Sequence, residues 1–256
     1  MPERTVFMTL HRAASMGLWR WLRSLSDETG VAHYAGNSRN FPDDSSIVED
    51  PAPIARLTGL IGPIRGFVDL SALPETQQVF QLRDPRDVLV STYYAFTFMH
   101  ELPEGAAEEE VAADRRRWQD MGIDAFVLHD KVLWGPSWRK IALGSDALVG
   151  RYRAFCHVLA RRDAILLRYE DLFFDFDAWW SPFRQALLPW IPPDHLERFR
   201  EKVADDVRPP EHEDILAHQR HMIPGDHREK LKPATVAALD KKFADALAFL
   251  RYSAAN

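Results

Sequence analysis

The sequence lacks several features that would define its class directly. It contains one cysteine, Cys156, so an intrachain disulfide and a cysteine-rich zinc site are both excluded. It has no apolar stretch of about 18 residues, so no membrane span is expected. The first nine residues include an acid and only a short apolar run, unlike a signal peptide. These absences predict a soluble, cytoplasmic protein.

An excess of positive charge is also missing. Lysine and arginine together number 32 against 38 aspartate and glutamate residues, which gives a formal net charge of −6. Proteins that bind nucleic-acid backbones are usually basic overall, so no nucleic-acid partner is expected. Any anion site must therefore be a local cluster. The motif Gly-x-x-x-x-Gly-Lys-Ser/Thr is absent as well, which argues against an ordinary ATP or GTP phosphate loop.

What the sequence does contain predicts an α/β fold. With 256 residues, of which 46% are hydrophobic, the chain can bury a large core, and we expect one domain over residues 1–256. Short apolar runs at residues 5–10, 66–70, 78–82 and 164–172 predict strands that alternate with helical patterns. This alternation is typical of a central, mostly parallel sheet flanked by helices. Ligands bind such sheets at the carboxyl ends of the strands.

A helical stretch interrupts this alternation at residues 101–143. Within it, the run AAEEEVAADRRRWQ places acids before bases, which suits an exposed helix. Two interpretations stay open at this point. The stretch is either a solvated helical face or an insertion that forms a lid or a wall of an acceptor pocket.

An arginine and a serine bracket the start of one predicted helix. The segment VFQLRDPRDVLVSTYYAF, residues 79–96, begins as a strand, turns at Arg-Asp-Pro-Arg-Asp and continues as a helix. Arg83 ends the strand and Ser91 lies inside the helix. A guanidinium can bind one oxyanion through two hydrogen bonds, and a hydroxyl can add a third. Alternatively, Arg83 pairs with an acid of the turn and Ser91 is a packed small residue.

A second candidate anion site follows the first predicted strand. The segment TLHRAASMGLWRWL places Arg12 in a loop and Ser15 near a helix N-terminus. Free backbone N–H groups and the helix dipole favour a phosphate there. Two such sites on neighbouring strand ends would suit a ligand with two separated phosphates. The alternative for Arg12 and Ser15 is an ordinary capped turn.

These segments resemble motifs of the sulfotransferases that use 3′-phosphoadenosine 5′-phosphosulfate (PAPS). QLRDPRDVLVSTYY is similar to the 3′-phosphate motif of that family, and LHRAASMGLW is similar to its 5′-phosphosulfate loop. LLRYEDL resembles the strand end Lys-Tyr-Glu-Asp-Met/Leu. RHMIPGDHREKLKP, at residues 220–233, resembles the C-terminal pattern Arg-Lys-Gly-x-x-Gly-Asp-Trp-Lys. The four motifs occur in the order of the family.

The resemblance implies a P-loop-like sulfotransferase fold that binds PAPS and releases 3′,5′-adenosine bisphosphate (PAP). It implies that Arg83 and Ser91 hold the 3′-phosphate with help from Arg220. It also implies that Tyr169 lies near the adenine. The implied 5′-phosphosulfate loop consists of Arg12, Ala13, Ala14, Ser15 and Met16.

The sequence departs from the family at several motif positions. Arg12 replaces a lysine, which keeps a permanent charge but does not readily donate a proton. Met16 stands where a threonine often occurs. His221 replaces a lysine of the C-terminal motif, which predicts a weaker or pH-sensitive 3′-phosphate clamp. His227 stands where tryptophan is usual.

Sulfuryl transfer also needs a base to accept the proton of the acceptor. Many family members use a histidine at the end of the strand before the 3′-phosphate strand, and here that position falls on Asp69. Its carboxylate could serve if burial raised its pKa, although acids at strand ends are often caps. His129 and His11 are the other candidates, and both also suit purely structural roles. A base elsewhere in the chain is a further alternative.

The resemblance therefore predicts a PAPS-dependent sulfotransferase. It would transfer the sulfuryl group in line, without a metal ion, to a hydroxyl or an amine of a small molecule, glycan or lipid. Two alternatives stay open. One is an ATP-dependent kinase with a P-loop-like fold, and the other is a non-catalytic member that binds a nucleotide or a partner protein.

Overall fold

A computed structural model shows the fold. The structure describes residues 1–35, 51–99, 108–130, 133–134, 141–142, 144–161, 164–216 and 220–252. The chain divides into two compact units. Unit 1 contains Met1–Arg83 and His157–Arg208, and unit 2 contains Asp84–Cys156 and Pro209–Asn256. The expectation of a single domain stays a prediction.

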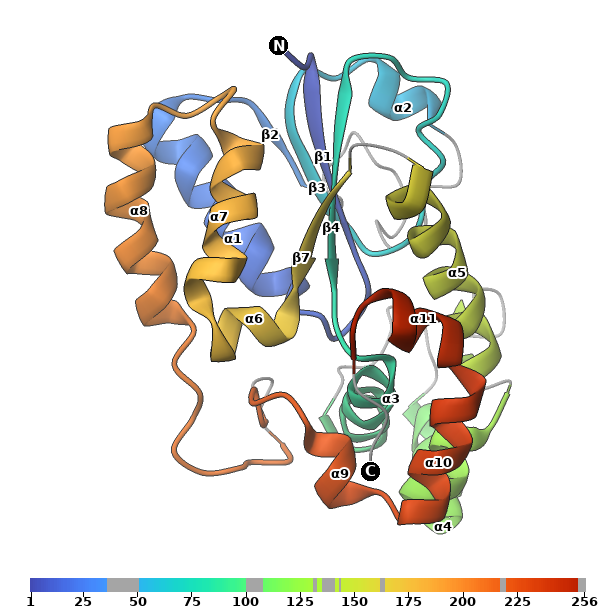
Figure 1. Ribbon diagram of the computed structural model, residues 1–256. Helices are drawn as coiled ribbons and strands as arrows, with labels where there is room; N and C mark the ends of the chain where they lie inside the picture. The colour runs from blue at the N-terminus through green and yellow to red at the C-terminus, as the bar shows by residue number, and fades with distance from the viewer. Residues whose placement is uncertain are drawn as a thin grey trace. The chain divides into compact units, whose positions relative to one another are not determined.

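Unit 1 is built on a five-stranded sheet in which every strand is parallel to its neighbours (Figure 1). The order is β2-β3-β1-β4-β7. Every residue of the central strand β1 is buried, as expected for the middle of a parallel sheet. The predicted parallel sheet is therefore confirmed. The strands are β1 (Arg4–Thr9), β2 (His33–Tyr34), β3 (Gly59–Ile64), β4 (Thr76–Leu82) and β7 (Ile165–Arg168).

Three of the four predicted strands occur where the apolar runs lie, as β1, β4 and β7. The strand predicted at residues 66–70 is wrong, because the strand in this region is β3, which ends at Ile64. Glycine and proline inside GLIGPI conceal it. Gly62 has a φ of 112°, and a Cβ there would lie 2.3 Å from the carbonyl oxygen of Phe7 in β1. Only glycine allows the two strands to approach this closely.

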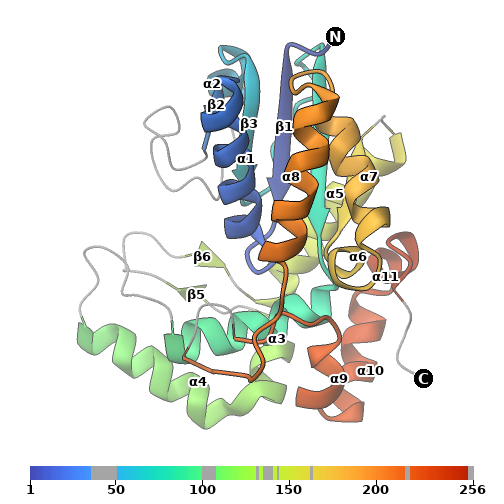
Figure 2. The same ribbon diagram turned by 90° about the vertical axis from the view of Figure 1, so that its left-hand side faces the viewer.

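Three helices of unit 1, α1, α7 and α8, lie side by side on one face of the sheet (Figures 1 and 2). In α1, the buried residues Leu18, Trp21, Leu22 and Leu25 recur at helical spacing and form one apolar face. This face explains why the segment after β1 folds back along the sheet. The helices of unit 1 are α1 (Ser15–Thr29), α2 (Ala52–Ala55), α6 (Tyr169–Phe174), α7 (Phe176–Leu187) and α8 (Pro193–Asp206).

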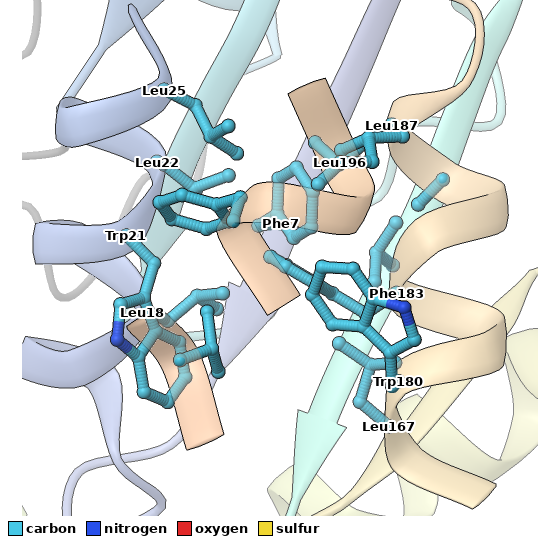
Figure 3. Close-up of a cluster of buried hydrophobic side chains, with 14 of the residues drawn as sticks. Phe7, Leu18, Trp21, Leu22, Leu25, Leu167, Trp180, Phe183, Leu187 and Leu196 are labelled. Carbon is cyan, nitrogen blue, oxygen red and sulfur yellow. The ribbon is translucent and has the colours of Figure 1, made fainter. Parts of the chain in front are cut away.

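An aromatic core joins the sheet to these helices (Figure 3). The ring of Phe7 in β1 packs edge-on against Phe183 of α7, with 6.1 Å between the ring centroids. Trp21 of α1 meets Trp179 of α7 in the same geometry at 5.5 Å. Because aromatic side chains bury large areas, these contacts hold β1 and α1 rigidly. The loop that connects them is therefore anchored at both ends.

Unit 2 is mainly helical. Its helix α3 contacts α4 and α9, and α10 contacts α4. Part of the helical stretch predicted at 101–143 is the helix α4, which bends at Gly122, and several other residues of that stretch lie outside the described part of the chain. No helix in the described part is long and apolar enough to cross a membrane. The elements are α3 (Pro85–Tyr94), the π-helix η1 (Ala95–Met99), α4 (Glu108–Leu128), β5 (Leu133–Trp134), β6 (Ile141–Ala142), α9 (Asp226–Lys230), α10 (Pro233–Lys242) and α11 (Ala244–Phe249), with most of α5 (Ser145–Arg161).

Candidate functional site

The loop between β1 and α1 has an unusual backbone. Arg12 and Ala14 adopt positive φ angles of 69° and 58°, a region that residues with side chains rarely occupy. Ala14 precedes α1, and its side chain provides no cap for the first turn of the helix. Ser15 begins the helix and is only 8% exposed. A helix N-terminus of this kind favours an anion, because its first backbone N–H groups have no partner within the helix.

Two side chains at the end of β4 donate hydrogen bonds to backbone carbonyl oxygens of this loop. Gln81, which is completely buried, donates a hydrogen bond from Nε2 to the carbonyl oxygen of Ala13 at 2.6 Å. Arg83, directly after β4, donates from Nη1 to the carbonyl oxygen of Arg12 at 3.1 Å. The end of one strand thus fixes the loop that follows its neighbour. This arrangement accounts for the strained backbone, since residues held on several sides can persist in unfavourable conformations.

Arginines follow three adjacent strands of the sheet. Arg12 lies in the loop after β1, Arg65 follows β3 directly and Arg83 follows β4 directly. Burial, together with repulsion from Arg65 and Arg83, lowers the pKa of Arg12 to about 10. All three side chains still carry a positive charge at neutral pH. Because the strands are parallel, the arginines lie at the same edge of the sheet and form a local site of positive potential.

An aromatic residue adjoins this cluster of arginines. The guanidinium carbon of Arg83 lies 4.3 Å from the ring centroid of Tyr169, the first residue of α6 after β7. Arg83 is 3% exposed, and Tyr169 also packs against Phe173. The face of the ring therefore stabilises the cation in a largely desolvated place. Unit 1 thus brings Arg12, Arg83 and Tyr169 together, as the sequence motifs suggest.

The candidate residues of unit 2 lie in two segments. Ser91 is half-buried in α3, whose N-terminus is capped by the carboxylate of Asp84 and begins with Pro85. Arg220 and His221 lie in the segment before α9 and both approach Asp226. The guanidinium of Arg220 is hydrogen-bonded to Asp226, and Nδ1 of His221 lies 3.6 Å from the same carboxylate.

The segment before α9 is tied to α3 within unit 2. Asp87 in the first turn of α3 accepts hydrogen bonds from the backbone N–H groups of Gly225 and His227, at 2.7 and 2.9 Å. Nδ1 of His227 lies 2.6 Å from the same carboxylate. His227 therefore anchors this segment through both its backbone N–H and its ring.

Comparison with known proteins supports the fold through structure alone. No protein-family model matches the chain, and no curated protein matches it in sequence. The crystal structure of mouse sulfotransferase SULT7A1 complexed with PAP superposes over 98% of this chain and 89% of its own, with a TM-score of 0.57 and 11% identity. The chain has the sulfotransferase fold. This confirms the predicted α/β class and the resemblance in fold.

Two structures of retinol dehydratase are similar to the chain as well. One is in complex with retinol and PAP, and the other with androsterone and inactive cofactor PAP. Both have a TM-score of 0.49 and cover 96% of this chain and 81% of their own, at 14% and 15% identity. At the 11% identity of the mouse structure, the likeness concerns the fold alone, and the activity has to be inferred from the residues.

Arg65 was not identified from the sequence as a site residue. Its Nη2 lies 2.8 Å from the sulfur of Met16, an exposed residue in the first turn of α1. The strand expected at residues 66–70 placed Arg65 before a strand, whereas β3 places it directly after one. The available signal was an arginine at the end of the apolar run GLIGPI.

The three candidate bases, Asp69, His11 and His129, differ in their exposure to solvent. Asp69 is exposed, and its Oδ1 accepts a hydrogen bond of 2.8 Å from the backbone N–H of Ser71, as in a turn cap. Asp69 therefore lacks the burial that was expected of a base at this position. His11 is half-buried beside Arg12 in the loop of unit 1, and His129 is exposed after α4 in unit 2. The identity of the base stays a prediction.

Proposed function

We propose that the protein is a PAPS-dependent sulfotransferase. The observation that carries this proposal is the gathering of Arg12, Arg65 and Arg83 where β1, β3 and β4 end. Burial is the main cause of the lowered pKa of Arg12, repulsion from Arg65 and Arg83 adds to it, and a multiply charged anion would relieve that repulsion. The N-terminus of α1, which has no side-chain cap, offers backbone N–H groups to an anionic group of the nucleotide. The ring of Tyr169 offers an aromatic surface to its adenine.

The residues of unit 1 fit PAPS by their chemistry. Arg65 would hold the 5′-phosphosulfate with the loop residues Arg12, Ala13, Ala14, Ser15 and Met16. Arg83 would bind the 3′-phosphate, and Tyr169 would lie near the adenine. The resemblance assigns Ser91, Arg220 and His221 of unit 2 to the 3′-phosphate too.

In the proposed sulfuryl transfer, the positive charges of Arg12 and Arg65 would do most of the work of the protein. When bound, PAPS supplies an activated sulfuryl group. Arg12 and Arg65 would stabilise the negative charge that develops on the leaving phosphate, and they need little reorientation because the strand ends hold them. Arg12 stays protonated at neutral pH and so acts by charge. One of the three candidate bases, Asp69, His11 or His129, would accept the proton of the acceptor, a hydroxyl or an amine of a small molecule, glycan or lipid.

One observation favours a second candidate, a non-catalytic protein that binds the nucleotide. Asp69 is exposed and engaged as a turn cap, so the best-matched base position lacks the environment that a base requires. Such a protein would bind PAP and PAPS without consuming PAPS.

Ligand-dependent thermal unfolding tests the nucleotide assignment. At about 100 times its dissociation constant, a ligand stabilises the folded protein by about 2.7 kcal/mol. We expect PAP to raise the unfolding midpoint more than ADP, or ATP with Mg²⁺, at equal concentrations. A larger shift with ADP or ATP would contradict the proposal and favour the kinase alternative.

A further inference from the structure

Arg220 is a buried cation held by two acids of unit 2, one at each terminal nitrogen. Its side chain is 8% exposed, with Nη1 hydrogen-bonded to Glu213 and Nη2 to Asp226. The guanidinium carbon also lies 4.1 Å from the ring centroid of Tyr94 in α3. A guanidinium buried without a counter-ion is strongly unfavourable, so unit 2 requires anionic partners at this position.

The two acids differ in how firmly the fold holds them. Asp226 is 1% exposed and begins α9, and the backbone N–H groups on both sides of it donate to Asp87. Glu213 lies in residues 211–216, which are all exposed and form neither helix nor strand. Glu213 is exposed as a whole residue, and its side chain alone keeps 26% of its surface in solvent. Glu213 can therefore leave Arg220 by moving its side chain into solvent, whereas Asp226 cannot.

Glu213 also binds a second cation. Its Oε2 accepts a hydrogen bond of 2.6 Å from Nζ of Lys230, which lies 6.0 Å from the Tyr94 ring centroid. One carboxylate thus uses one oxygen for each of two cations, as a phosphate group can. Burial alone would raise the pKa of Glu213, but hydrogen bonds from Lys230 and Arg220 outweigh it and lower the pKa. Glu213 is therefore an anion at neutral pH.

We propose that Glu213 is an intramolecular competitor of the 3′-phosphate. Glu213 occupies Nη1 of Arg220 and the amine of Lys230, and a bound 3′-phosphate displaces it from both. Asp226 stays on Nη2 and keeps the guanidinium oriented. This inference rests on the proposed function, because it requires Arg220 to bind the 3′-phosphate, and it adds Lys230 as a further phosphate ligand.

The variant Glu213→Gln tests this directly, because it keeps the shape of the side chain and removes its charge. Calorimetric titration with PAP, 3′-AMP and 5′-AMP measures binding with and without a 3′-phosphate. We expect the variant to bind PAP and 3′-AMP about tenfold more tightly, equivalent to about 1.4 kcal/mol. Binding of 5′-AMP is expected to change less than twofold.

A matched control is Glu197→Gln in unit 1. Glu197 also accepts a hydrogen bond from an arginine, Arg184, at 2.9 Å. Arg184 lies on α7 and Glu197 on α8, and neither residue belongs to a candidate site. This variant should leave all three affinities unchanged. Glu213→Asp keeps the charge on a shorter side chain, so a smaller gain in 3′-AMP affinity is expected, and it provides a second test if the glutamine variant folds poorly.

The outcomes separate this inference from the proposed function. If wild-type protein prefers PAP to 5′-AMP but Glu213→Gln and Glu213→Asp bind PAP no more tightly, the competitor role is refuted and the sulfotransferase proposal stands. If wild-type protein shows no preference for PAP over 5′-AMP, both proposals fail. A selective gain for the ligands with a 3′-phosphate supports both.

Discussion

At the scale of single residues, arginine provides the positive charge that gathers at the edge of the unit 1 sheet. Burial and two neighbouring cations lower the pKa of Arg12 to about 10, which leaves the guanidinium charged. A lysine has an ordinary pKa of about 10.4 and would lie much closer to neutrality under the same influences. An arginine rather than a lysine at position 12 therefore suits a loop that adjoins Arg65 and Arg83.

The variant Arg12→Lys makes this testable through pH. The same surroundings would lower the pKa of the lysine, so its charge is lost as pH rises through that lowered value. We expect PAP affinity of the variant to fall between pH 7 and pH 9, while wild-type affinity stays nearly constant. Equal pH profiles for the two proteins, measured by calorimetry, would show that the cation cluster does not act on this position.

Arg83 is expected to distinguish the two phosphates of PAP. Arg83→Ala removes a guanidinium that can bind the 3′-phosphate through charged hydrogen bonds, so PAP binding should weaken by about 1.5–3 kcal/mol. Binding of 5′-AMP should weaken less than binding of PAP, because Arg83→Ala also removes the hydrogen bond to the carbonyl oxygen of Arg12 while Gln81 still holds the loop at Ala13. Arg83→Lys should recover part of the loss because it restores the charge. Equal losses for PAP and 5′-AMP would refute the assignment.

At the scale of elements, the site residues that the sequence could predict are those that follow strands with a recognisable apolar pattern. β1, β4 and β7 each contain a short apolar run that predicts a strand, so Arg12, Arg83 and Tyr169 could be placed at strand ends from the sequence. β3 contains glycine and proline, and its existence depends on the close approach of Gly62 to Phe7. No local pattern reveals such a contact, and Arg65 was missed for that reason.

Arg65 should act on the 5′ side of the nucleotide, because it adjoins Met16 at the start of α1. We expect Arg65→Ala to weaken PAP and 5′-AMP by the same factor, by about 1–3 kcal/mol for a lost charged contact. Arg20→Ala, an exposed arginine of the same helix, should have no effect. A loss confined to PAP would instead place Arg65 on the 3′ side.

Asp87 should be a stabilising residue of unit 2. Replacement by alanine removes the acceptor of the buried N–H of His227, of the partly buried N–H of Gly225 and of the His227 ring, so we expect a loss of about 3 kcal/mol in the free energy of unfolding. Asp177→Ala, which breaks an exposed ion pair with Arg200, should lose less than about 1 kcal/mol. Urea unfolding measures both. Similar losses for the two variants would show that Asp87 is not an anchor.

At the scale of the whole molecule, an acidic chain has gathered its cations locally. The formal net charge is −6, and the arginines of unit 1 gather only because three strands far apart in sequence end at the same edge of a sheet. The sequence motifs predicted Arg12 and Arg83 at neighbouring strand ends but did not include Arg65. The pairing of Glu213 with Arg220 could not be predicted, because an acid in an irregular segment has no pattern that specifies its partner.

The most direct test of the central claim is transfer of sulfur-labelled sulfuryl groups from PAPS to a panel of phenols, alcohols, amines, saccharides and lipids. We expect a labelled product from at least one of these classes, with one PAP released for each product, and loss of both in Arg12→Ala. Binding of PAP without consumption of PAPS by any acceptor would contradict enzymatic function and favour a nucleotide-binding protein with the sulfotransferase fold.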